Sequence, residues 1–335
     1  MNNTILAALF LVALSPLHAV ELKSLADQAA GGDMRAQFNL GLNYGQGNGV
    51  PKDAVESAKW YRASAEQGDP MAQFNLGLRY ARGEGVTKDP EQAASWYRKA
   101  AEQGDERAQY TLGLMYQRGQ GVPKDAGESV KWYRASAEQG GPMAQCNLGI
   151  HYLNGDGVEK NSTEAVKWLR AAAENGNAPA QYEMGQVFRI GEIVKMDGVQ
   201  AVDWFRKSAD QGYSGAQAML GCLYAEGRLV AKDNAESLKW FRKAADQGNA
   251  QGQFSVGLIY SEGLGVEKNH DEAIKWFRNS AEQGCEQGEL AMGICYANGQ
   301  GVPRDQTAAA AWFRKAAAKG LAEAQGHIRA MAVAE

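Results

Sequence analysis

The chain has 335 residues, of which 44% are hydrophobic and 22% charged. This composition is typical of globular proteins and excludes bulk disorder and collagen-like or mucin-like architectures. The formal net charge is −4, from 35 basic and 39 acidic residues. No basic excess exists to displace counterions from phosphates, so the balance does not favour nucleic-acid binding.

Residues 1–19 are predicted to be a signal peptide that lies outside the fold. The segment from Met1 to Val20 has no Asp, Glu, Lys or Arg, and its apolar run ends at Ser15-Pro16, before a potential cleavage site after Ala19. Ten apolar residues are too few to span a bilayer as a helix. We therefore expect a periplasmic or secreted protein that is not inserted in a membrane after cleavage. A mature N-terminus with a buried helix is the alternative.

One tryptophan recurs every 36 residues along the chain. An Arg follows each Trp by two residues, a Gly follows it by eight, and a Val column keeps the same register. Fixed self-similarity at this period is the signature of a solenoid. The eight tryptophans are Trp60, Trp96, Trp132, Trp168, Trp204, Trp240, Trp276 and Trp312.

Each repeat predicts a first helix, which we illustrate with the repeat that starts at residue 69. This helix is expected from Pro70 to Arg82, with apolar residues at i, i+4 and i+8 from Ala72. Gly83-Glu84-Gly85 ends it, because glycine adopts positive φ without strain. Gly77 would weaken the helix by about 1 kcal/mol relative to Ala. Because this Gly recurs in all eight repeats, we infer close helix contact there.

An Asp or Asn begins the second helix of each repeat, as Asp89 does in the same example. A Glu or Gln stands three residues later in seven of the eight repeats. This pair is a variant of the capping box, in which each side chain accepts a hydrogen bond from the other residue's backbone N–H. The apolar face that follows is expected to end at Gly104.

The Trp column is expected to belong to the core. Each helix pair has more apolar surface than it can bury alone, and stacking buries the surplus. One buried Trp removes roughly 150–250 Å² from water, worth about 4–6 kcal/mol as an upper estimate. The Arg column cannot share the helical face of the Trp. We interpret it as a structural contact, with an anion-binding ladder as the alternative.

The repeated pattern closely resembles the Sel1-like repeat, a relative of the tetratricopeptide class. It reads A-x-x-x-L-G-x-x-Y-x-x-G-x-G-V-x-x-D-x-x-x-A-x-x-W-[YF]-R-x-A-A-x-x-G. The resemblance implies an all-α fold, an α/α right-handed superhelical solenoid of eight 36-residue helix-turn-helix repeats over residues 33–320. Residues 20–32 would form an N-terminal capping half-repeat, and residues 321–335 a C-terminal capping helix.

The same resemblance implies a non-catalytic adaptor or scaffold in the cell envelope or outside the cell. Such a protein holds a protein or peptide partner in a concave groove lined mostly by first helices. The identity of the partner is not specified by the sequence. We expect a monomer that needs no cofactor.

If the repeated columns serve packing, partner binding is expected at columns that vary. Positions 15, 19 and 22 after each Trp recur at i, i+4 and i+7 on the first helix and predict one exposed face. Asn amides suit an extended peptide, apolar side chains suit an anchor residue and Arg suits an acidic group. Ordinary variation of a solvated surface is the alternative. The candidate residues are Asn39, Asn43, Asn75, Arg79, Arg82, Met115, Arg118, Asn147, His151, Met219, Leu223 and Ile259.

The fifth and sixth repeats depart from the loop pattern. Ile193 and Leu229 replace the second loop glycine. A residue with a side chain needs a different turn there, and we expect altered curvature near residues 189–197. A hydrophobic partner patch at Ile190 and Ile193 is one interpretation, and a locally repacked loop is the alternative.

No catalytic or metal site is expected. The sequence has no Ser-His-Asp order, H-E-x-x-H motif, Walker loop or C-x-x-C pair, and its four cysteines share no metal-ligand spacing. We interpret Cys146, Cys222, Cys285 and Cys295 as small packed thiols. A cysteine-rich subgroup of the resembling family is linked to penicillin binding and weak β-lactamase activity, which implies one alternative function. A self-assembling structural element is another.

Overall fold

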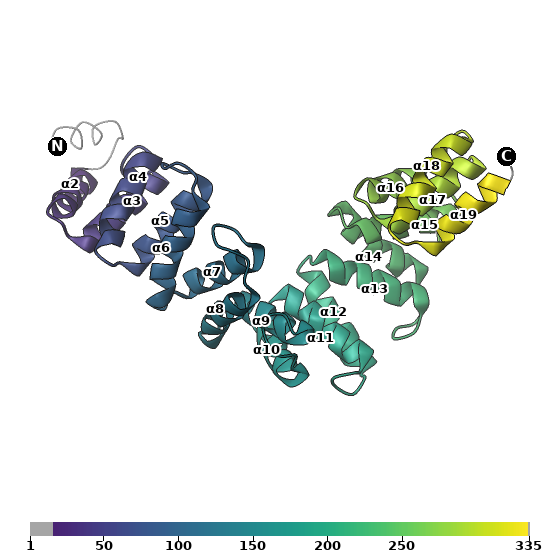
Figure 1. Ribbon diagram of the computed structural model, residues 1–335, viewed down its shortest axis with the longest axis horizontal. Coiled ribbons are helices and arrows are strands. Elements are labelled where there is room, and N and C mark those ends of the chain that lie inside the picture. The colour runs from purple at the N-terminus through teal and green to yellow at the C-terminus, as the bar shows by residue number, and fades with distance from the viewer. Residues whose placement is uncertain (1–15, 334–335) are drawn as a thin grey trace. The chain divides into compact units, whose positions relative to one another are not determined.

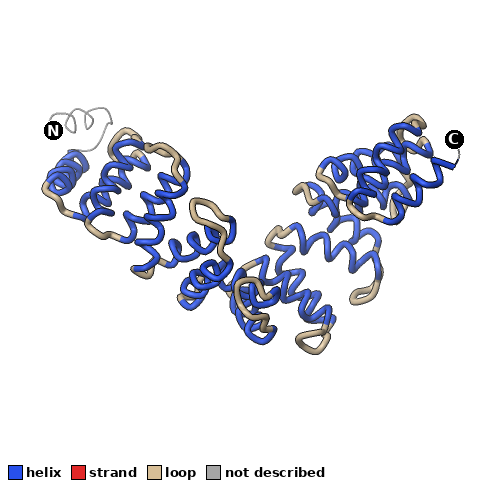
Figure 2. The backbone as a smooth tube through the Cα atoms, in the orientation of Figure 1, coloured by secondary structure: helices blue, strands red, loops and turns tan. Residues whose placement is uncertain are grey.

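The computed structural model describes residues 16–333 as a chain of α-helices joined by short loops (Figure 1). No strand occurs in this described range (Figure 2). The chain divides into two compact units, unit 1 ending at Ala172 and unit 2 beginning at Ala173. The signal peptide predicted over residues 1–19 lies largely outside the described residues, and the first described helix begins at Pro16.

Eight helix pairs form the repeats, which confirms the expected all-α fold. The first helices are α3 (Met34–Gln46), α5 (Pro70–Arg82), α7 (Glu106–Arg118), α9 (Pro142–Asn154), α11 (Ala178–Ile190), α13 (Ser214–Glu226), α15 (Ala250–Glu262) and α17 (Glu286–Asn298). The second helices are α4 (Ala54–Glu66), α6 (Pro90–Glu102), α8 (Ala126–Glu138), α10 (Ser162–Glu174), α12 (Gly198–Asp210), α14 (Asn234–Asp246), α16 (His270–Glu282) and α18 (Gln306–Ala318). A single helix precedes the pairs, α2 (Pro16–Ala30), and another follows them, α19 (Ala322–Val333).

Local sequence sets the ends of each first helix, as α5 illustrates. Its N-cap Asp69 accepts a hydrogen bond from the Ala72 N–H. Its C-cap Gly83 has φ 73°, in the left-handed region, and donates its N–H to the Arg79 carbonyl. Gly85 also has positive φ, and a Cβ there would lie 1.9 Å from the carbonyl oxygen of Ala54. This loop therefore requires glycine twice, once for the cap and once for close approach to the preceding repeat.

The second helices begin with only half of the predicted capping box. The Asp89 carboxylate accepts from the N–H groups of Glu91 and Gln92, as expected. The prediction of the reciprocal hydrogen bond is wrong, because the Asp89 N–H donates instead to the Tyr80 carbonyl. The acidic side chain three residues after the cap is thus left for other partners. In repeat 3, Glu128 accepts from the indole Nε1 of Trp132 at 3.1 Å.

The tryptophans join neighbouring repeats, as predicted. Trp96 packs with Tyr61 and Ala65 of the preceding second helix and with Ala72 and Leu76 of the first helix of its own repeat. Trp132 occupies the same place one repeat later, against Ala100, Ala101, Ala108 and Leu112. Trp60, Trp132 and Trp240 are each 8% exposed, and the other five are half-buried. Each indole therefore removes apolar surface of two successive hairpins from water.

The glycine inside each first helix allows the close contact that its recurrence suggested. A Cβ at Gly77 would lie 2.8 Å from Cε1 of Tyr97, on the second helix of the same repeat. Real Cβ atoms do not approach that closely, so any larger residue would push the two helices apart. The ring of Tyr97 also lies 5.4 Å from that of Phe74, centroid to centroid.

Glutamine side chains connect successive hairpins at the ends of the second helices. Gln103 donates to the Gln73 side-chain oxygen at 2.8 Å and to the Gly68 carbonyl at 2.9 Å. Gln73 in turn donates to the Ala65 carbonyl of the preceding repeat. At the last junction Glu289 and Lys319 replace this pair, with Nζ and Oε1 separated by 2.6 Å. The buried amides thereby satisfy carbonyl groups at the helix ends that would otherwise lack partners.

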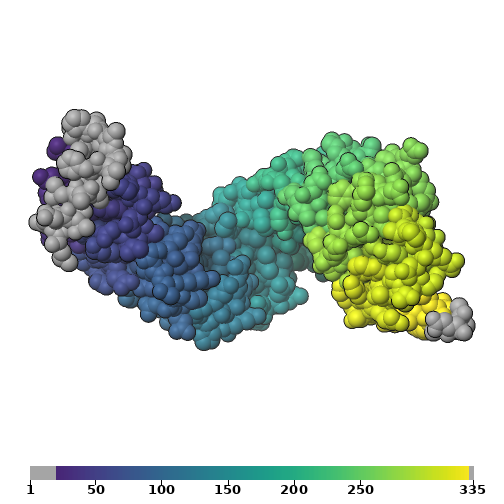
Figure 3. Space-filling model, turned by 90° about the horizontal axis from the view of Figure 1, so that it is seen from above, coloured from purple at the N-terminus to yellow at the C-terminus, as the bar shows by residue number. Residues whose placement is uncertain are grey.

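The terminal helices continue the stack. Gln37 donates to the Ala29 carbonyl of α2, which is the same bond that Gln73 makes to α4. At the other end the rings of Phe313 and His327 stack with centroids 4.6 Å apart. The yellow surface of α19 covers the C-terminal end of unit 2 (Figure 3). Capping roles for residues 20–32 and 321–335 remain predictions that agree with these contacts.

The loops of repeats 5 and 6 take the different turn that their sequences predict. Every residue with positive φ in the described range is a glycine, and neither Ile193 nor Leu229 adopts it. A Cβ at Gly198 would lie 2.7 Å from Cδ2 of Leu229, so the leucine packs against the start of α12. Ile190 and Ile193 are 51% and 36% exposed, and the predicted apolar patch is accessible.

Candidate partner-binding site

The predicted face of the first helices is exposed in only one of its three columns. Position 22 after each Trp, which includes Arg82 and Arg118, is exposed in every repeat. At position 15, Asn39, Asn75 and Asn147 are half-buried. This position also contributes Met219, which is half-buried as well.

Position 19 is the column for which the predicted exposure is wrong. Its exposed fractions are 7% at Met115, 2% at His151, 4% at Leu223 and 5% at Ile259, whereas Asn43 is half-buried. These side chains point at the second helix of the preceding repeat. A first helix packs against two second helices and so buries a wider arc than a single amphipathic stripe suggests.

Arg79 belongs to the same buried column and is held by its own chain. Its guanidinium donates to Glu84 at 2.8 Å and to the Ser57 hydroxyl at 3.2 Å. Its Cζ lies 5.8 Å from the centroid of the Tyr61 ring. The side chain is only 14% exposed. Arg79 therefore closes a junction between two repeats, while Arg82, 60% exposed, remains accessible to a partner.

His151 occupies the equivalent place in repeat 4. Its Nδ1 lies 2.7 Å from the carbonyl oxygen of Asp156, and its ring lies 5.7 Å from that of Tyr133. A partner could not reach this ring without displacing the packing between α8 and α9.

Sequence reasoning missed the column at position 18. Its residues are mostly apolar and half-buried, and Leu258 is 40% exposed. Position 11 completes the exposed arc, with Met71 at 47% and Met143 at 57%. Positions 11, 15, 18 and 22 follow the same helical period, and the signal was overlooked because apolar residues were assigned to the core. The members of position 18 are Leu42, Leu78, Leu114, Ile150, Gln186, Cys222, Leu258 and Ile294.

The recurring arginines bind tyrosine rather than a ligand. Arg134 donates to the Tyr152 hydroxyl at 2.6 Å, and its Cζ lies 5.7 Å from the centroid of that ring. The same donor and acceptor positions recur at Arg62, Arg98, Arg206 and Arg242, paired with Tyr80, Tyr116, Tyr224 and Tyr260. Each arginine thus joins a second helix to the first helix of the next repeat. The structural interpretation of this column is confirmed at these five positions.

The charge of the exposed rim differs between the two units. In unit 1, position 22 holds Gln46, Arg82, Arg118 and Asn154; in unit 2 it holds Ile190, Glu226, Glu262 and Asn298. Unit 1 therefore offers a basic rim and unit 2 an acidic one. The two rims would attract oppositely charged groups.

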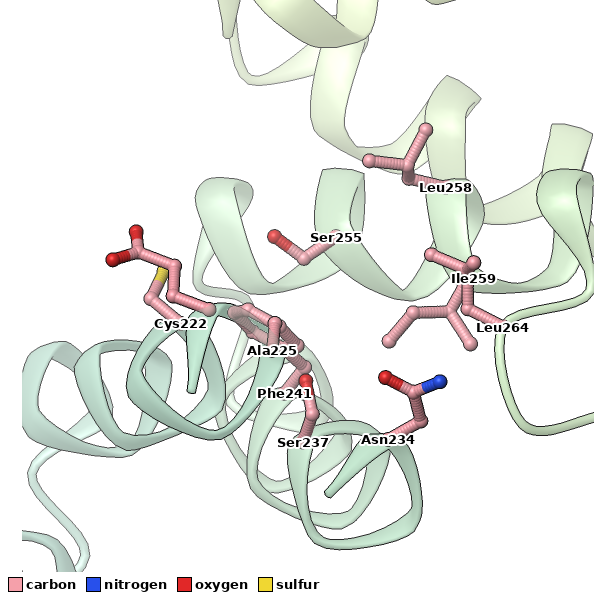
Figure 4. A pocket seen from close by; sticks show the side chains of 10 residues that line it. Cys222, Ala225, Asn234, Ser237, Phe241, Ser255, Leu258, Ile259 and Leu264 are labelled. Atoms are coloured by element: carbon pink, nitrogen blue, oxygen red, sulfur yellow. The ribbon is translucent and has the colours of Figure 1, made fainter. Parts of the chain in front are cut away.

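A cavity of about 160 Å³ opens between α13, α14 and α15 in unit 2. Its walls are mainly apolar, and Ser237, Ser255 and Asn234 add polar atoms that point towards the same space (Figure 4). Burial raises the pKa of the Cys222 thiol, and the nearby Glu226 carboxylate raises it further. This thiol is therefore protonated near neutral pH and is not a nucleophile. The remaining lining residues are Ala225, Phe241, Leu258, Ile259 and Leu264.

The residue type in one buried column also differs between the two units. In unit 1 the residue after Trp is Tyr61, Tyr97, Tyr133 or Leu169, whereas unit 2 has phenylalanine at all four of its positions. Burial raises the pKa of Tyr97 to about 12, partly opposed by the charge of Arg82. Burial also raises the pKa of Tyr133, against hydrogen bonds from Asn147 and Ser129 that lower it. Asn147 therefore contacts the core as well as the accessible face.

Neither a metal centre nor a membrane span is found between residues 16 and 333. No three side chains among the described His, Cys, Asp and Glu lie close enough together to hold a metal ion. None of the described helices combines the length and the apolar character needed to cross a bilayer.

Comparisons with known proteins agree on one repeat family. A family model described as Sel1 repeat matches residues 35–69, 70–105, 106–141, 142–177, 178–213, 214–249, 250–285 and 287–321. A protective antigen of uropathogenic Escherichia coli with an SLR fold is 40% identical, over 92% of this chain and 67% of the other, with TM-score 0.77. A Sel1 repeat protein from Oxalobacter formigenes is 32% identical, over 98% of this chain and 93% of the other, with TM-score 0.70. Comparison with curated protein sequences gave no match.

Proposed function

Because the chain belongs to the Sel1-repeat family, we propose that it is a non-catalytic scaffold that binds a partner polypeptide along the exposed arc of its first helices. Repeats of this family generally mediate protein–protein interactions. Stacked helix pairs suit this task because they present a long surface without a deep catalytic cleft.

The observation that carries the proposal is the separation of packing from accessible positions. The recurring Trp, Gln, Arg and Gly residues all contact neighbouring helices. In the exposed arc, positions 11, 15 and 22 vary from repeat to repeat, whereas position 18 is Leu or Ile in six of the eight repeats. Side chains that vary between repeats can contact successive residues of an extended partner.

We restrict the proposed contact residues to those whose side chains are accessible. We retain Asn39, Asn75, Asn147 and Met219 with the exposed Arg82 and Arg118, and we add position 18. We no longer assign direct contacts to Met115, His151, Leu223 or Ile259, because their side chains are buried. In unit 1, the amides can bond the backbone of an extended peptide, and the two arginines favour an acidic one.

We place this function in the periplasm or outside the cell. The apolar N-terminal run supports export. The Escherichia coli relative is described as a protective antigen, which agrees with a location that antibodies can reach.

Charge reversal of the basic rim tests the proposal. The double variant Arg82→Glu and Arg118→Glu should lower in-cell crosslinking of the mature protein to its partners at least tenfold, because an acidic peptide would be repelled. The stability change should stay within about 0.5 kcal/mol, since both side chains are exposed. Quantitative mass spectrometry of the crosslinked products measures the loss, and thermal unfolding checks the fold.

A matched control changes the same charge in the same two repeats, in the loops that follow the first helices. Lys88→Glu with Lys124→Glu alters exposed loop residues that are likewise 36 positions apart. The control should retain its partners. Undiminished capture by the rim variant would remove this face of unit 1 from the proposal.

A further inference from the structure

The cavity of unit 2 opens where two first helices have smaller side chains than their counterparts. Cys222 stands in the column at position 18, which is Leu or Ile in six of the eight repeats. Ser255 stands at position 15, where unit 1 has Asn or Thr. Both residues line the cavity of about 160 Å³ between α13, α14 and α15 (Figure 4). The space therefore arises on the face of the first helices that the proposed function assigns to a partner.

The interior of this cavity suits an apolar group rather than a cation. The equivalent junction of unit 1 is closed by Arg79, whose guanidinium donates to the Ser57 hydroxyl. A Cβ at Gly45 would lie 2.6 Å from Nη2 of Arg79 and 3.0 Å from Oγ of Ser57. Ala225 corresponds to Gly45 five repeats later, so its methyl group fills the place of the guanidinium. That methyl also covers the Ser237 hydroxyl, whose hydrogen is donated to a backbone carbonyl.

Two exposed leucines stand at the mouth of the cavity. Leu258 is 40% exposed and Leu264 is 42% exposed, and both line it. Leu264 is the one apolar residue in its column, because the other seven repeats have Asn, Asp, Glu, Gln or Arg at this loop position. Phe241 and Ile259, which are buried, form the deeper wall. A partner that covered the two leucines would remove their apolar surface from water.

The size of the cavity fits one aliphatic side chain. A cavity of about 150 Å³ with walls of Leu, Ile and Phe can hold a benzene molecule. The isobutyl group of leucine is slightly smaller than benzene, whereas an indole ring is considerably larger. A charged group would lose its hydration against these walls without gaining a counter-charge inside the cavity. Leucine is therefore the side chain that the cavity accepts best.

The surface around the mouth carries negative charge. Glu226 lines the cavity, and Glu262 holds the same position on the next first helix; both are exposed. Arg228 approaches Glu226 at 3.5 Å, but its side chain is 81% exposed and a cation of the partner can compete with it. The same column of unit 1 holds Arg82 and Arg118 instead. Unit 2 therefore favours a basic segment, whereas unit 1 favours an acidic one.

We propose that this cavity binds the side chain of a leucine within a basic segment of the partner polypeptide. The proposal rests on the proposed function, because it supposes a polypeptide on the first-helix surface. The leucine enters between α13 and α15 and covers Leu258 and Leu264, and the basic residues on either side of it pair with Glu226 and Glu262. Apolar burial supplies most of the affinity, and the surface charges select the segment.

Tripeptide probes test the site without the natural partner. Methyl NMR of the full mature chain follows Leu258, Ile259 and Leu264 during titration with acetyl-Lys-Leu-Lys-amide. We expect saturable shifts with a dissociation constant of about 1–10 mM, as befits so small a ligand. Acetyl-Lys-Ala-Lys-amide lacks the anchor and should bind about tenfold more weakly or worse. Acetyl-Glu-Leu-Glu-amide keeps the anchor but reverses the charge, and should bind about fivefold more weakly or worse.

Two variants change the cavity by copying residues from other repeats. Cys222→Leu introduces the leucine that repeats 1–3 have at position 18, and it should weaken the Lys-Leu-Lys probe about tenfold or more by filling the space. Leu264→Gln introduces the glutamine of repeats 3 and 8 at the mouth and should weaken the probe about threefold. Because Leu264 is exposed, this second variant keeps the test decisive if Cys222→Leu fails to fold.

A third variant tests the contribution of charge. Glu226→Gln with Glu262→Gln introduces the glutamine that repeat 1 has at position 22, and it should weaken the Lys-Leu-Lys probe about fivefold. Asp246→Asn with Glu282→Gln is the matched control, since it removes the same charge from exposed ends of the second helices in the same repeats. Binding of the probe by this control should be unchanged.

Several results would overturn the inference: no saturable shift with the Lys-Leu-Lys probe, equal binding of either other probe, or undiminished binding by a folded Cys222→Leu or by Leu264→Gln. Shifts of the same methyl groups that grow with protein concentration in the absence of probe would assign the cavity to a second copy of the chain instead. In-cell capture that persists while the Lys-Leu-Lys probe fails would reject the leucine site alone. Loss of capture by the Arg82 and Arg118 variant tests the proposed function independently.

Discussion

The two units share one packing scheme and differ in what they leave accessible. Both join their repeats through tryptophans and glutamines in equivalent places. Unit 1 has buried tyrosines, a basic rim and Arg79 across one junction; unit 2 has phenylalanines, an acidic rim and an open cavity. The contrast teaches that stacking fixes the recurring positions, whereas chemistry is free to change at the remaining ones.

The largest effect on the free energy of unfolding is expected at the tryptophans, where the two units are most alike. Trp132→Ala in unit 1 and Trp240→Ala in unit 2 should each lower the free energy of unfolding by about 3–5 kcal/mol, because each removes an indole that is buried between two hairpins. Denaturant unfolding followed by circular dichroism measures both losses. A loss below about 1 kcal/mol in either unit would contradict the shared packing scheme.

Alkaline pH should destabilise unit 1 through its buried tyrosines, which unit 2 lacks at the equivalent positions. Burial raises the pKa of Tyr97 to about 12, above its ordinary value of 10.0. The folded state therefore favours the neutral phenol. This stability is fully present below pH 10 and is lost as the pH rises towards 12, by up to about 2–3 kcal/mol. Tyr97→Phe should remove the part of the loss that Tyr97 contributes, and hydrogen exchange of unit 1 peptides at pH 8 and pH 11.5 would measure it.

Two thiols must be controlled in this comparison. Burial raises the pKa of Cys295 to about 11 and also raises that of Cys222, so both thiols destabilise unit 2 above pH 9. A Cys222→Ala and Cys295→Ala background removes this contribution. If unit 2 then loses as much protection as unit 1 between pH 10 and 12, the tyrosine explanation is wrong.

The last junction of unit 2 offers a smaller test. Lys319→Met should cost about 2 kcal/mol, because it leaves the carboxylate of Glu289, 5% exposed, without its cation. The double variant Glu289→Gln and Lys319→Gln recreates the amide pair of Gln253 and Gln283 and should remain within about 1 kcal/mol of the wild type. Thermal unfolding of the set measures the coupling. A double variant as unstable as Lys319→Met would show that the two pairs are not equivalent.

Substitution of Arg79 should give the smallest change in the free energy of unfolding. Arg79→Met keeps much of the aliphatic volume but removes the bonds to Glu84 and Ser57 and the contact with the Tyr61 ring. We expect a loss of about 1 kcal/mol, since the carboxylate of Glu84 is 43% exposed and can bind water instead. Chemical denaturation measures it. An equally large loss in Arg82→Met, which changes an exposed side chain, would argue against a structural role specific to Arg79.

Most of the fold could be predicted from the sequence because short sequence patterns that specify local structure recur in each repeat. The bounds expected for the first helix of repeat 2 coincide with those of α5, and the close contact at Gly77 is confirmed. The capping box failed in its second half, because the N–H of Asp89 bonds to Tyr80 across the loop. The Tyr80 carbonyl is brought to this position by the fold of the loop, and the residue types of a capping box do not reveal it.

The site was harder to predict because exposure depends on how many neighbours a helix has. A helical wheel correctly assigned Arg82 and Arg118 to the surface, but it placed Ile259 and His151 there as well. It cannot know that each first helix touches the second helix of the preceding repeat. The cavity beside Ile259 could not be predicted, because its walls come from three helices that are brought together only in the folded chain.

The central claim, that the exposed arc of the first helices holds a partner, is tested most directly by site-specific photocrosslinking in cells. A photoreactive amino acid would replace the last residue of four first helices, Arg82, Arg118, Glu226 and Glu262. Matched exposed positions at the ends of second helices are Glu66, Glu102, Asp246 and Glu282. The account predicts adducts with a polypeptide from the first set and none from the second. Adducts from the second-helix positions alone, or equally from both sets, would contradict it.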